Sequence, residues 1–310
     1  MKISLLLNGA LQAETSTRAV VSSCTPDIGD AYVPPVADAY ERWLMLLYRD
    51  VLGRAPERGA VDAARRALIS GATRTSVALP VLRSPEAADR ATARMFSTLL
   101  GRPANPGESS SLIDVLESQE YADLSQPEFY GPDSGSLVQA AACDLLGRKA
   151  ADSEVRAARM FLTRDQAVPA FLGSDDYRRG FVNQIYTRFL RRAATESELS
   201  QGATAQPDDV AAAVAGSAEY FRRANGGGTI DQLQTLTRGR IRVALRRAAE
   251  LRVGVLRGGR RIGTVRLGHM ARGVSVAKWR RRGGAPASLI VEAWSRGRLI
   301  DATDPIAAGR

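Results

Sequence analysis

Four segments between residues 36 and 224 repeat one pattern: an apolar stretch that ends in Leu-Gly-Arg or a close relative, followed half a repeat later by Ser-x-(Asp/Glu). The third letters of successive endings are 48, 46 and 44 residues apart, and the endings are Leu52-Gly53-Arg54, Leu100-Gly101-Arg102, Leu146-Gly147-Arg148 and Leu190-Arg191-Arg192. A nearly constant period of this length is typical of tandem arrays of small helical units. Because each such unit is a packing module, the pattern constrains the architecture strongly and the chemistry weakly.

Each ending predicts where a helix stops. Apolar pairs spaced by four residues precede the endings and form one broad helical stripe, as at Ile185-Tyr186 and Phe189-Leu190. The glycines of the first three endings favour a left-handed helix C-cap, a conformation that costs glycine little and other residues roughly 1 kcal/mol or more. Arg191 occupies the equivalent place in the fourth segment, so we expect that helix to end in another geometry or to carry strain.

The Ser-x-(Asp/Glu) half of the pattern predicts where the next helix begins. Ser84, Ser118, Ser174 and Ser217 each place a hydroxyl at an N-cap and an acid in the first turn. A short apolar helix is expected before each serine, and a middle helix is expected between that helix and the preceding stop. The second segment has 17 residues between its stop and its serine where the first has 31, so the second is expected to lack one helix.

The first segment carries the pattern best, with Leu47-Tyr48-Arg49-Asp50-Val51-Leu52-Gly53-Arg54-Ala55-Pro56, then Gly59 and Ser84-Pro85-Glu86. It resembles the bacterial domain of unknown function 4214, itself distantly similar to the helical linker domains of phycobilisomes. The likeness covers about residues 36–224, although Ala-Arg-Arg at 64–66 replaces the middle-helix Trp common in that family. The resemblance implies non-catalytic helical modules, which are common in secreted or surface-associated bacterial proteins, and it supplies no catalytic residues.

The hydrophobic pattern changes after Asn225-Gly226-Gly227-Gly228, where three glycines favour a flexible break. Residues 229–236 are expected to form a last short helix. From Arg240 the apolar period drops to two, which predicts short strands at 241–245, 251–255, 262–267, 274–279, 289–294 and 299–302. Strands of this length, separated by Gly-rich turns, indicate a small antiparallel sandwich.

The strand region carries an Arg257-Gly258-Gly259-Arg260 hairpin, Gly273 before a strand that ends in Trp279, and a final hairpin at Ser295-Arg296-Gly297-Arg298. This arrangement resembles the immunoglobulin-like module of flagellar hook-capping proteins and of many exported actinobacterial proteins. The predicted fold class is a multidomain α + β protein. Its expected parts are an N-terminal arm or remnant signal segment at 1–35, four all-α helical repeats at 36–224, a Gly-rich linker with a short helix at 225–239, and a basic immunoglobulin-like β-sandwich at 240–305.

Charge is segregated along the chain. Residues 237–310 hold 18 basic and 4 acidic residues, a net of +14, whereas residues 1–236 hold 25 and 29, a net of −4. Arginine supplies 40 of the 43 basic residues, and the bias of a GC-rich genome explains that residue type better than it explains the segregation. Two interpretations stay open: a solvated basic face, or a surface for an anionic partner such as a wall polymer, a lipid surface or nucleic acid.

Signatures of catalysis and of metal binding are scarce, so we predict a protein that is not an enzyme, with no catalytic, cofactor-binding or metal-ligating residue. His269 is the only histidine, and the glycines at 226–228 lack the Lys-Ser/Thr of a phosphate loop. Cys24 and Cys143 are too few for zinc, and they are either free thiols or, in an exported chain, a disulfide.

Other notable side chains each have two interpretations. Trp279 and Trp294 are either core aromatics of the sandwich or platforms on which a sugar stacks. Paired acids such as Asp175-Asp176 lie at expected helix starts, where capping explains them, and the same holds for Asp208-Asp209.

The N-terminus imitates a secretory signal with a short apolar core, and it is either a truncated signal or an arm with an extra strand at 18–24. No stretch approaches the ~20 apolar residues of a membrane span. The favoured hypothesis is a non-enzymatic bacterial protein, extracellular or associated with the cell envelope, whose helical array is a spacer or binding scaffold and whose basic sandwich attaches to an anionic polymer, a glycan or a protein. The alternative is a cytoplasmic or virion-type assembly component whose basic domain contacts nucleic acid, and missing aromatic residues among the arginines count against it.

Overall fold

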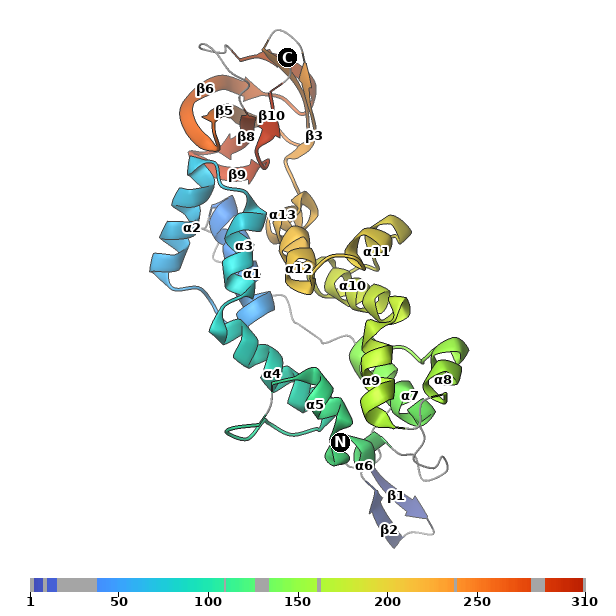
Figure 1. Cartoon of the computed structure of the whole chain (residues 1–310). Helices are drawn as coiled ribbons and strands as arrows, with labels where there is room; N and C mark the ends of the chain where they lie inside the picture. The colour runs from blue at the N-terminus through green and yellow to red at the C-terminus, as the bar shows by residue number, and fades with distance from the viewer. Residues whose placement is uncertain are drawn as a thin grey trace. The chain divides into compact units, whose positions relative to one another are not determined.

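The chain is a mixed α + β protein, as its sequence predicts: helices dominate the part up to Ala224, and antiparallel strands dominate the part from Ile230 (Figure 1). The computed structural model describes residues 3–7, 10–15, 38–108, 110–125, 134–160, 163–236, 239–279 and 288–308. The helices are α1 (Ala39–Leu52), α2 (Arg58–Ser70), α3 (Arg74–Leu82), α4 (Pro85–Leu99), α5 (Leu112–Glu117), α6 (Gln119–Ser125), α7 (Ser134–Leu146), α8 (Asp152–Ala158), α9 (Arg164–Gly173), α10 (Asp175–Leu190), α11 (Glu196–Gly202), α12 (Pro207–Gly216) and α13 (Ala218–Ala224).

Two compact units divide the chain. Unit 1 comprises Met1–Ile28, Asp89–Gln184 and Glu196–Thr204, and unit 2 comprises Gly29–Ala88, Ile185–Thr195 and Ala205–Arg310. The division falls within α4 and α10. The expected boundary at 225–239 is therefore not where the units divide, because residues on both sides of it belong to unit 2.

The predicted helix stops are confirmed. Gly53 adopts φ 67° and its N–H bonds to the Arg49 carbonyl, and the glycines at 101 and 147 adopt φ 67° and 64°. Arg191 adopts the same left-handed conformation, with φ 58°, so of the two expected outcomes the structure shows backbone strain and not another geometry. A left-handed backbone costs a residue with a Cβ about 1 kcal/mol, and Arg191 adopts it because it follows the end of α10.

The predicted helix starts are confirmed as well. All four serines accept a hydrogen bond from the backbone N–H three residues on, at 3.1 to 3.2 Å; these donors are Ala87, Tyr121, Tyr177 and Tyr220. The second segment lacks one helix, as expected, since only α5 is described between its stop and its serine where the first segment has α2 and α3.

In three of the four segments the arginine of the ending pairs with the acid that follows the serine, a contact here called a clamp. Three clamps are bidentate, with N–O distances of 2.5 to 2.7 Å: Arg54 to Glu86, Arg102 to Glu120, and Arg192 to Glu219. In the third segment the acid is the shorter Asp176, and Arg148 instead makes a bidentate pair with Glu154 at 2.7 and 2.8 Å. Each ending is thereby tied to a helix further along the chain.

A Tyr-Asp hydrogen bond shows which segments pack together. In unit 2 the hydroxyl of Tyr220, on α13 of the fourth segment, donates to Asp50 on α1 of the first segment at 2.8 Å. In unit 1 the hydroxyl of Tyr121, on α6 of the second segment, donates to Asp144 on α7 of the third at 2.8 Å. The short helices pair in the same way, α3 with α12 and α5 with α9. The first and fourth segments thus build the helical part of unit 2, and the second and third build most of unit 1.

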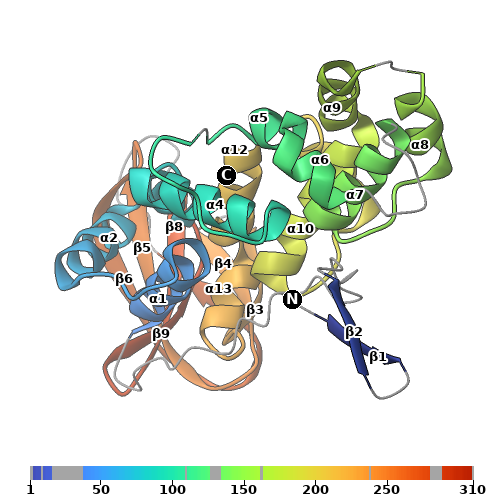
Figure 2. The same cartoon turned by 90° about the horizontal axis from the view of Figure 1, so that it is seen from below.

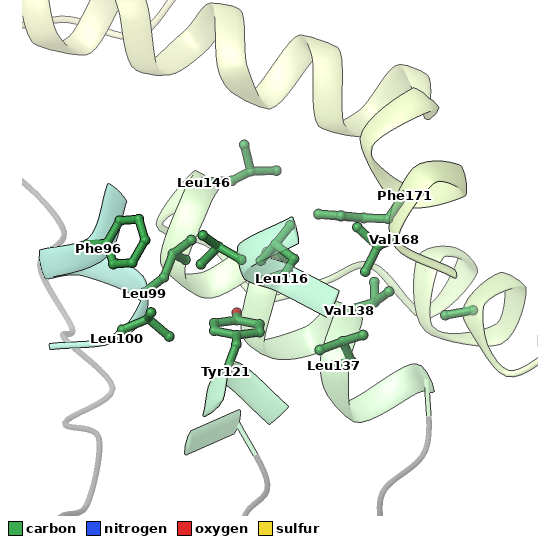
Figure 3. Packing of buried hydrophobic residues seen from close by; sticks show 14 residues of the cluster. Phe96, Leu99, Leu100, Leu116, Tyr121, Leu137, Val138, Leu146, Val168 and Phe171 are labelled. Carbon is green, nitrogen blue, oxygen red and sulfur yellow. The ribbon is translucent and has the colours of Figure 1, made fainter. Parts of the chain in front are cut away.

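Unit 1 has its own apolar core, and Figure 3 shows its side chains pointing toward one another. Leu116 and Tyr121 are fully buried at its centre. The other labelled members come from α4 and the residue that follows it, from α7 and from α9: Phe96, Leu99, Leu100, Leu137, Val138, Leu146, Val168 and Phe171. This core explains the apolar pairs that the sequence places at four-residue spacing.

The β domain of unit 2 consists of two antiparallel sheets. The three-stranded sheet has the order β3 (Ile230–Leu236), β4 (Arg240–Leu245), β7 (Gly273–Lys278). The five-stranded sheet has the order β10 (Ile306–Ala307), β8 (Ser288–Ser295), β5 (Ala249–Arg257), β6 (Arg260–Met270), with β9 (Arg298–Ala302) also paired to β8. One apolar cluster joins the two sheets; its fully buried members include Ile241, Val243, Leu251, Val253 and Val291. The six predicted strands all lie in this domain.

The expected short helix at 229–236 is wrong, because this segment is strand β3. Its register pairs Leu233 with Val243 of β4, and Ile230 packs into the domain core. Gly226 and Gly227, both with positive φ, lie between the end of α13 and the start of β3. Pairing with a sheet and burial of alternate side chains outweigh the weak local preference for a helix.

At the N-terminus β1 (Ile3–Leu7) and β2 (Ala10–Thr15) pair antiparallel. The extra strand expected at 18–24 lies outside the described residues. No helix in the described ranges is both long enough and apolar enough to cross a membrane.

The left-handed stop of α4 yields a stability prediction. A Cβ at Gly101 would meet no atom within 4 Å, so Gly101→Ala should cost about 1 kcal/mol through backbone strain alone. Gly173, in unit 1 and at the last residue of α9, is equally open but is not at positive φ, so Gly173→Ala should be neutral or stabilise by up to about 1 kcal/mol. Urea unfolding followed by far-ultraviolet circular dichroism measures both, and equal shifts would show that Gly101 is no left-handed cap.

Candidate functional site

The chemically distinctive part of the chain is its basic β domain, and the two charge signs are placed differently there. Among the described residues from 239 onward, ten of the thirteen arginines and lysines are exposed, and none of the four acids is. Glu292 and Asp301 are buried at 2 % and 3 % exposure. The surface of the domain is therefore more positive than its composition alone indicates.

One of these acids, Asp304, joins the strands to the helices of unit 2 through Arg74. Arg74, at the first turn of α3 and 2 % exposed, donates from Nε to the Gly216 carbonyl at the end of α12 at 2.9 Å. Its Nη1 donates to the Ala302 carbonyl of β9 at 3.1 Å, and its Nη2 pairs with Asp304 at 3.1 Å. The guanidinium also lies 4.5 Å from the ring centroid of Phe221 on α13. One side chain thus fastens two helical segments to the β domain.

Burial shifts the protonation equilibria of this network. Desolvation lowers the pKa of Arg74, and the charge of Asp304 opposes that shift. Desolvation also raises the pKa of Asp304, although Arg74 and a backbone N–H hold it down. Both shifts mean that burial is costly for each ion, so the pair specifies how the parts join more than it adds stability.

A second buried pair lies on the helix-facing side of the five-stranded sheet. Arg261 of β6 pairs with Glu292 of β8 across Gly254 of β5, and a Cβ at position 254 would lie 2.3 Å from the Arg261 guanidinium. Tyr40 of α1 is buried beside them, and burial together with the charge of Glu292 raises its pKa above the ordinary value. Figure 2 shows α1 and α2 on this side of the domain, where α1 contacts β9 and α2 contacts β6.

Asp301 has a capping role. Its carboxylate accepts the N–H groups of Thr229 and Ile230 at 2.6 and 2.7 Å, and these begin strand β3. Burial raises the pKa of Asp301, and the backbone donors oppose the shift. The sequence did not indicate this role for Asp301, because its partners are 71 and 72 residues away.

The exposed cations of the domain lie mainly on strands and hairpins. They include Arg257 and Arg260 at the β5–β6 turn, Arg296 and Arg298 at the β8–β9 turn, and Arg266 on β6. A hollow of about 360 Å³ lies nearby in unit 2, lined by Glu219, Arg222, Arg223, Gly227, Gly228 and Arg246. Its charges are largely engaged within the protein, for example Arg246 with Asp231 at 2.6 Å and Arg223 with Asp50 at 3.2 Å. Two of the arginines that line the hollow are therefore held in ion pairs within the protein.

The structure does not bring together the residues that the sequence offered as candidates for binding or catalysis. Trp279 is buried in the β-domain core, so the core interpretation holds for it. Trp294 is half-buried on the face of β8 that points away from the domain core, and the Arg252 guanidinium lies 4.0 Å from the centroid of its ring. His269 is exposed on β6.

Cys143 is half-buried on α7, and Cys24 lies outside the described residues. Asp175 and Asp176 lie in the first turn of α10, and Asp208 and Asp209 in that of α12, as capping predicts. Within the described ranges, no three His, Cys, Asp or Glu side chains gather so that they could hold a metal ion.

Comparison with protein families, with curated proteins and with solved structures found no match to this chain.

The Arg74 network yields a second stability prediction. Arg74→Met should cost about 3 kcal/mol or more, because it leaves Asp304 without its counter-ion and two carbonyls without their guanidinium donor. Arg83 joins the same two helices, α3 and α12, but its pair with Asp209 is half-exposed, so Arg83→Met should cost less than about 1 kcal/mol. All three tryptophans belong to unit 2, so fluorescence during urea unfolding reports both variants. Equal losses would mean that Arg74 does not fasten the domain.

Proposed function

We propose that this protein is a non-enzymatic bacterial binding scaffold, exported or associated with the cell envelope, whose β domain attaches it to an anionic polymer. The observation that carries the proposal is the separation of charge within that domain: from residue 239 onward ten of the thirteen described arginines and lysines are exposed, whereas Glu292, Asp301 and Asp304 are held in internal contacts. A domain that only needed solubility would gain from acids at the surface. A field of one sign attracts a polyanion and accelerates its encounter.

We propose that the helical part is a spacer or scaffold of four copies of one unit, similar to the domain of unknown function 4214. The supporting observations are the recurring stops, serine caps and arginine clamps. For the β domain we propose an immunoglobulin-like sandwich related to the hook-capping module. Two antiparallel sheets around one apolar cluster support that proposal.

A role without catalysis fits the use of the buried ionisable groups. Arg74, Glu292 and Asp301 join elements of unit 2, and Asp50 joins α1 to α13. These groups have structural partners within the unit. Export is proposed from the two resemblances.

The proposal predicts polyanion binding by the full-length protein. Titration calorimetry with a poly(glycerol phosphate) wall polymer should give binding that weakens steeply as salt rises, because each neutralised phosphate releases counterions. A neutral glycan should not bind. Failure to bind any polyanion at low salt would show that the arginines form a solvated face only.

Duplex DNA and anionic vesicles, compared at the same ionic strength, separate the proposal from its alternative. The wall polymer is expected to bind at least as tightly as DNA, because the described cations of the domain lie on strands and hairpins and not on a helix that enters a groove. Tighter and sequence-dependent DNA binding would favour an intracellular or virion-type component.

A further inference from the structure

The three-stranded sheet has one face in the domain core and one face open. Ile241, Val243 and Ala277 point into the core. The alternate positions of β3, β4 and β7 lie on the opposite side, here called the outer face: Gln232, Gln234, Leu236, Arg240, Arg242, Ala244, Val274, Val276 and Lys278. The corresponding side of the five-stranded sheet is occupied, since Leu256 and Ile290 there are only 0 % and 1 % exposed.

The outer face concentrates positive charge. The register places Arg240 directly opposite Lys278, and Arg242 follows two residues along β4 on the same side. Arg242 and Lys278 are exposed, and none of the nine positions of the outer face is acidic. The acid of β3, Asp231, is the bulged residue and is held by Arg246 at 2.6 Å. A face with exposed cations and no acid among its positions attracts an anion.

The remaining side chains suit an extended polymer. Gln232 and Gln234 are exposed amides that donate hydrogen bonds, and they lie beside β4. Val274 and Val276, on the edge strand β7, are 62 % and 55 % exposed, which is high for aliphatic side chains. They provide apolar contact for the carbon segments between charged groups. Arg240 and Arg242 are about 7 Å apart along the strand, so each can meet a different anionic group.

We propose that the outer face is the surface that binds the anionic polymer, through phosphodiester groups in an extended soluble chain. This inference rests on the proposed function and assigns its site. The arginine fork and the amide donors match the tetrahedral oxygens of a phosphate better than a neutral sugar. The flat strands favour a flexible single chain, and the aliphatic side chains lack the aromatic anchors typical of a bilayer surface.

The test uses two full-length variants that each remove two charges. Arg242→Gln with Lys278→Gln alters the outer face, and Arg257→Gln with Arg260→Gln alters the exposed β5–β6 turn of the same domain. With poly(glycerol phosphate) as the probe, the face variant should lose at least tenfold in affinity, and its logarithmic salt slope should fall by about two. The turn variant should lose less than threefold. Equal losses would overturn the assignment and indicate a diffuse field.

A second measurement guards against misfolding. Because Lys278 stands opposite a like charge, the face variant should melt at the same temperature as the natural protein or higher. A lower melting temperature would show that these cations stabilise the sheet, and it would overturn the inference. If the natural protein binds no phosphodiester polymer, the proposed function fails; if it binds and the face variant binds equally, only the site is wrong.

Discussion

The buried guanidinium of Arg74 is the contact on which the arrangement of unit 2 depends. It touches carbonyls at the end of α12 and in β9, the carboxylate of Asp304 and the face of Phe221. A buried ion without these partners would be untenable, so every partner has to be in place for the unit to close. The β domain is consequently part of the same compact unit as two helical segments, and its orientation toward them is defined by directional bonds as well as by apolar contact.

The inward acids of the β domain also shape its surface. Glu292, Asp301 and Asp304 make up three of the four acidic residues after position 236, and all three are drawn inward. Most arginines remain exposed on the strands and turns. The inward placement of these acids therefore accounts both for specific internal contacts and for the positive field at the surface. The proposal that the domain binds a polyanion follows from this link and not from the arginine count, which genome composition also explains.

Much of the local structure was predictable from the sequence. The stops, the serine caps, the missing helix of the second segment and six strands follow from glycine conformation, capping and apolar periodicity, all of which act over a few residues. The predictions are wrong or incomplete where contacts between different elements determine the structure. Residues 230–236 form a strand because they pair with β4 and pack Ile230 and Leu233 against the domain core. The Arg74 contacts, the pairing of Tyr220 with Asp50 and the contacts of the inward acids span 31 to 230 residues. No local signal marks such partners.

The pairing of the first segment with the fourth has a consequence for synthesis. Arg74 and Asp304 are separated by 230 residues, so at the usual rates of translation the first segment leaves the ribosome roughly 10 to 50 s before its last partner exists. Meanwhile the second and third segments already contain nearly everything that unit 1 needs. The newborn chain therefore carries α1, with the apolar side chains of Trp43 and Leu47 still uncovered, while its middle closes first. We therefore expect folding to run from the centre of the helical region outward, with the strands of the β domain added last.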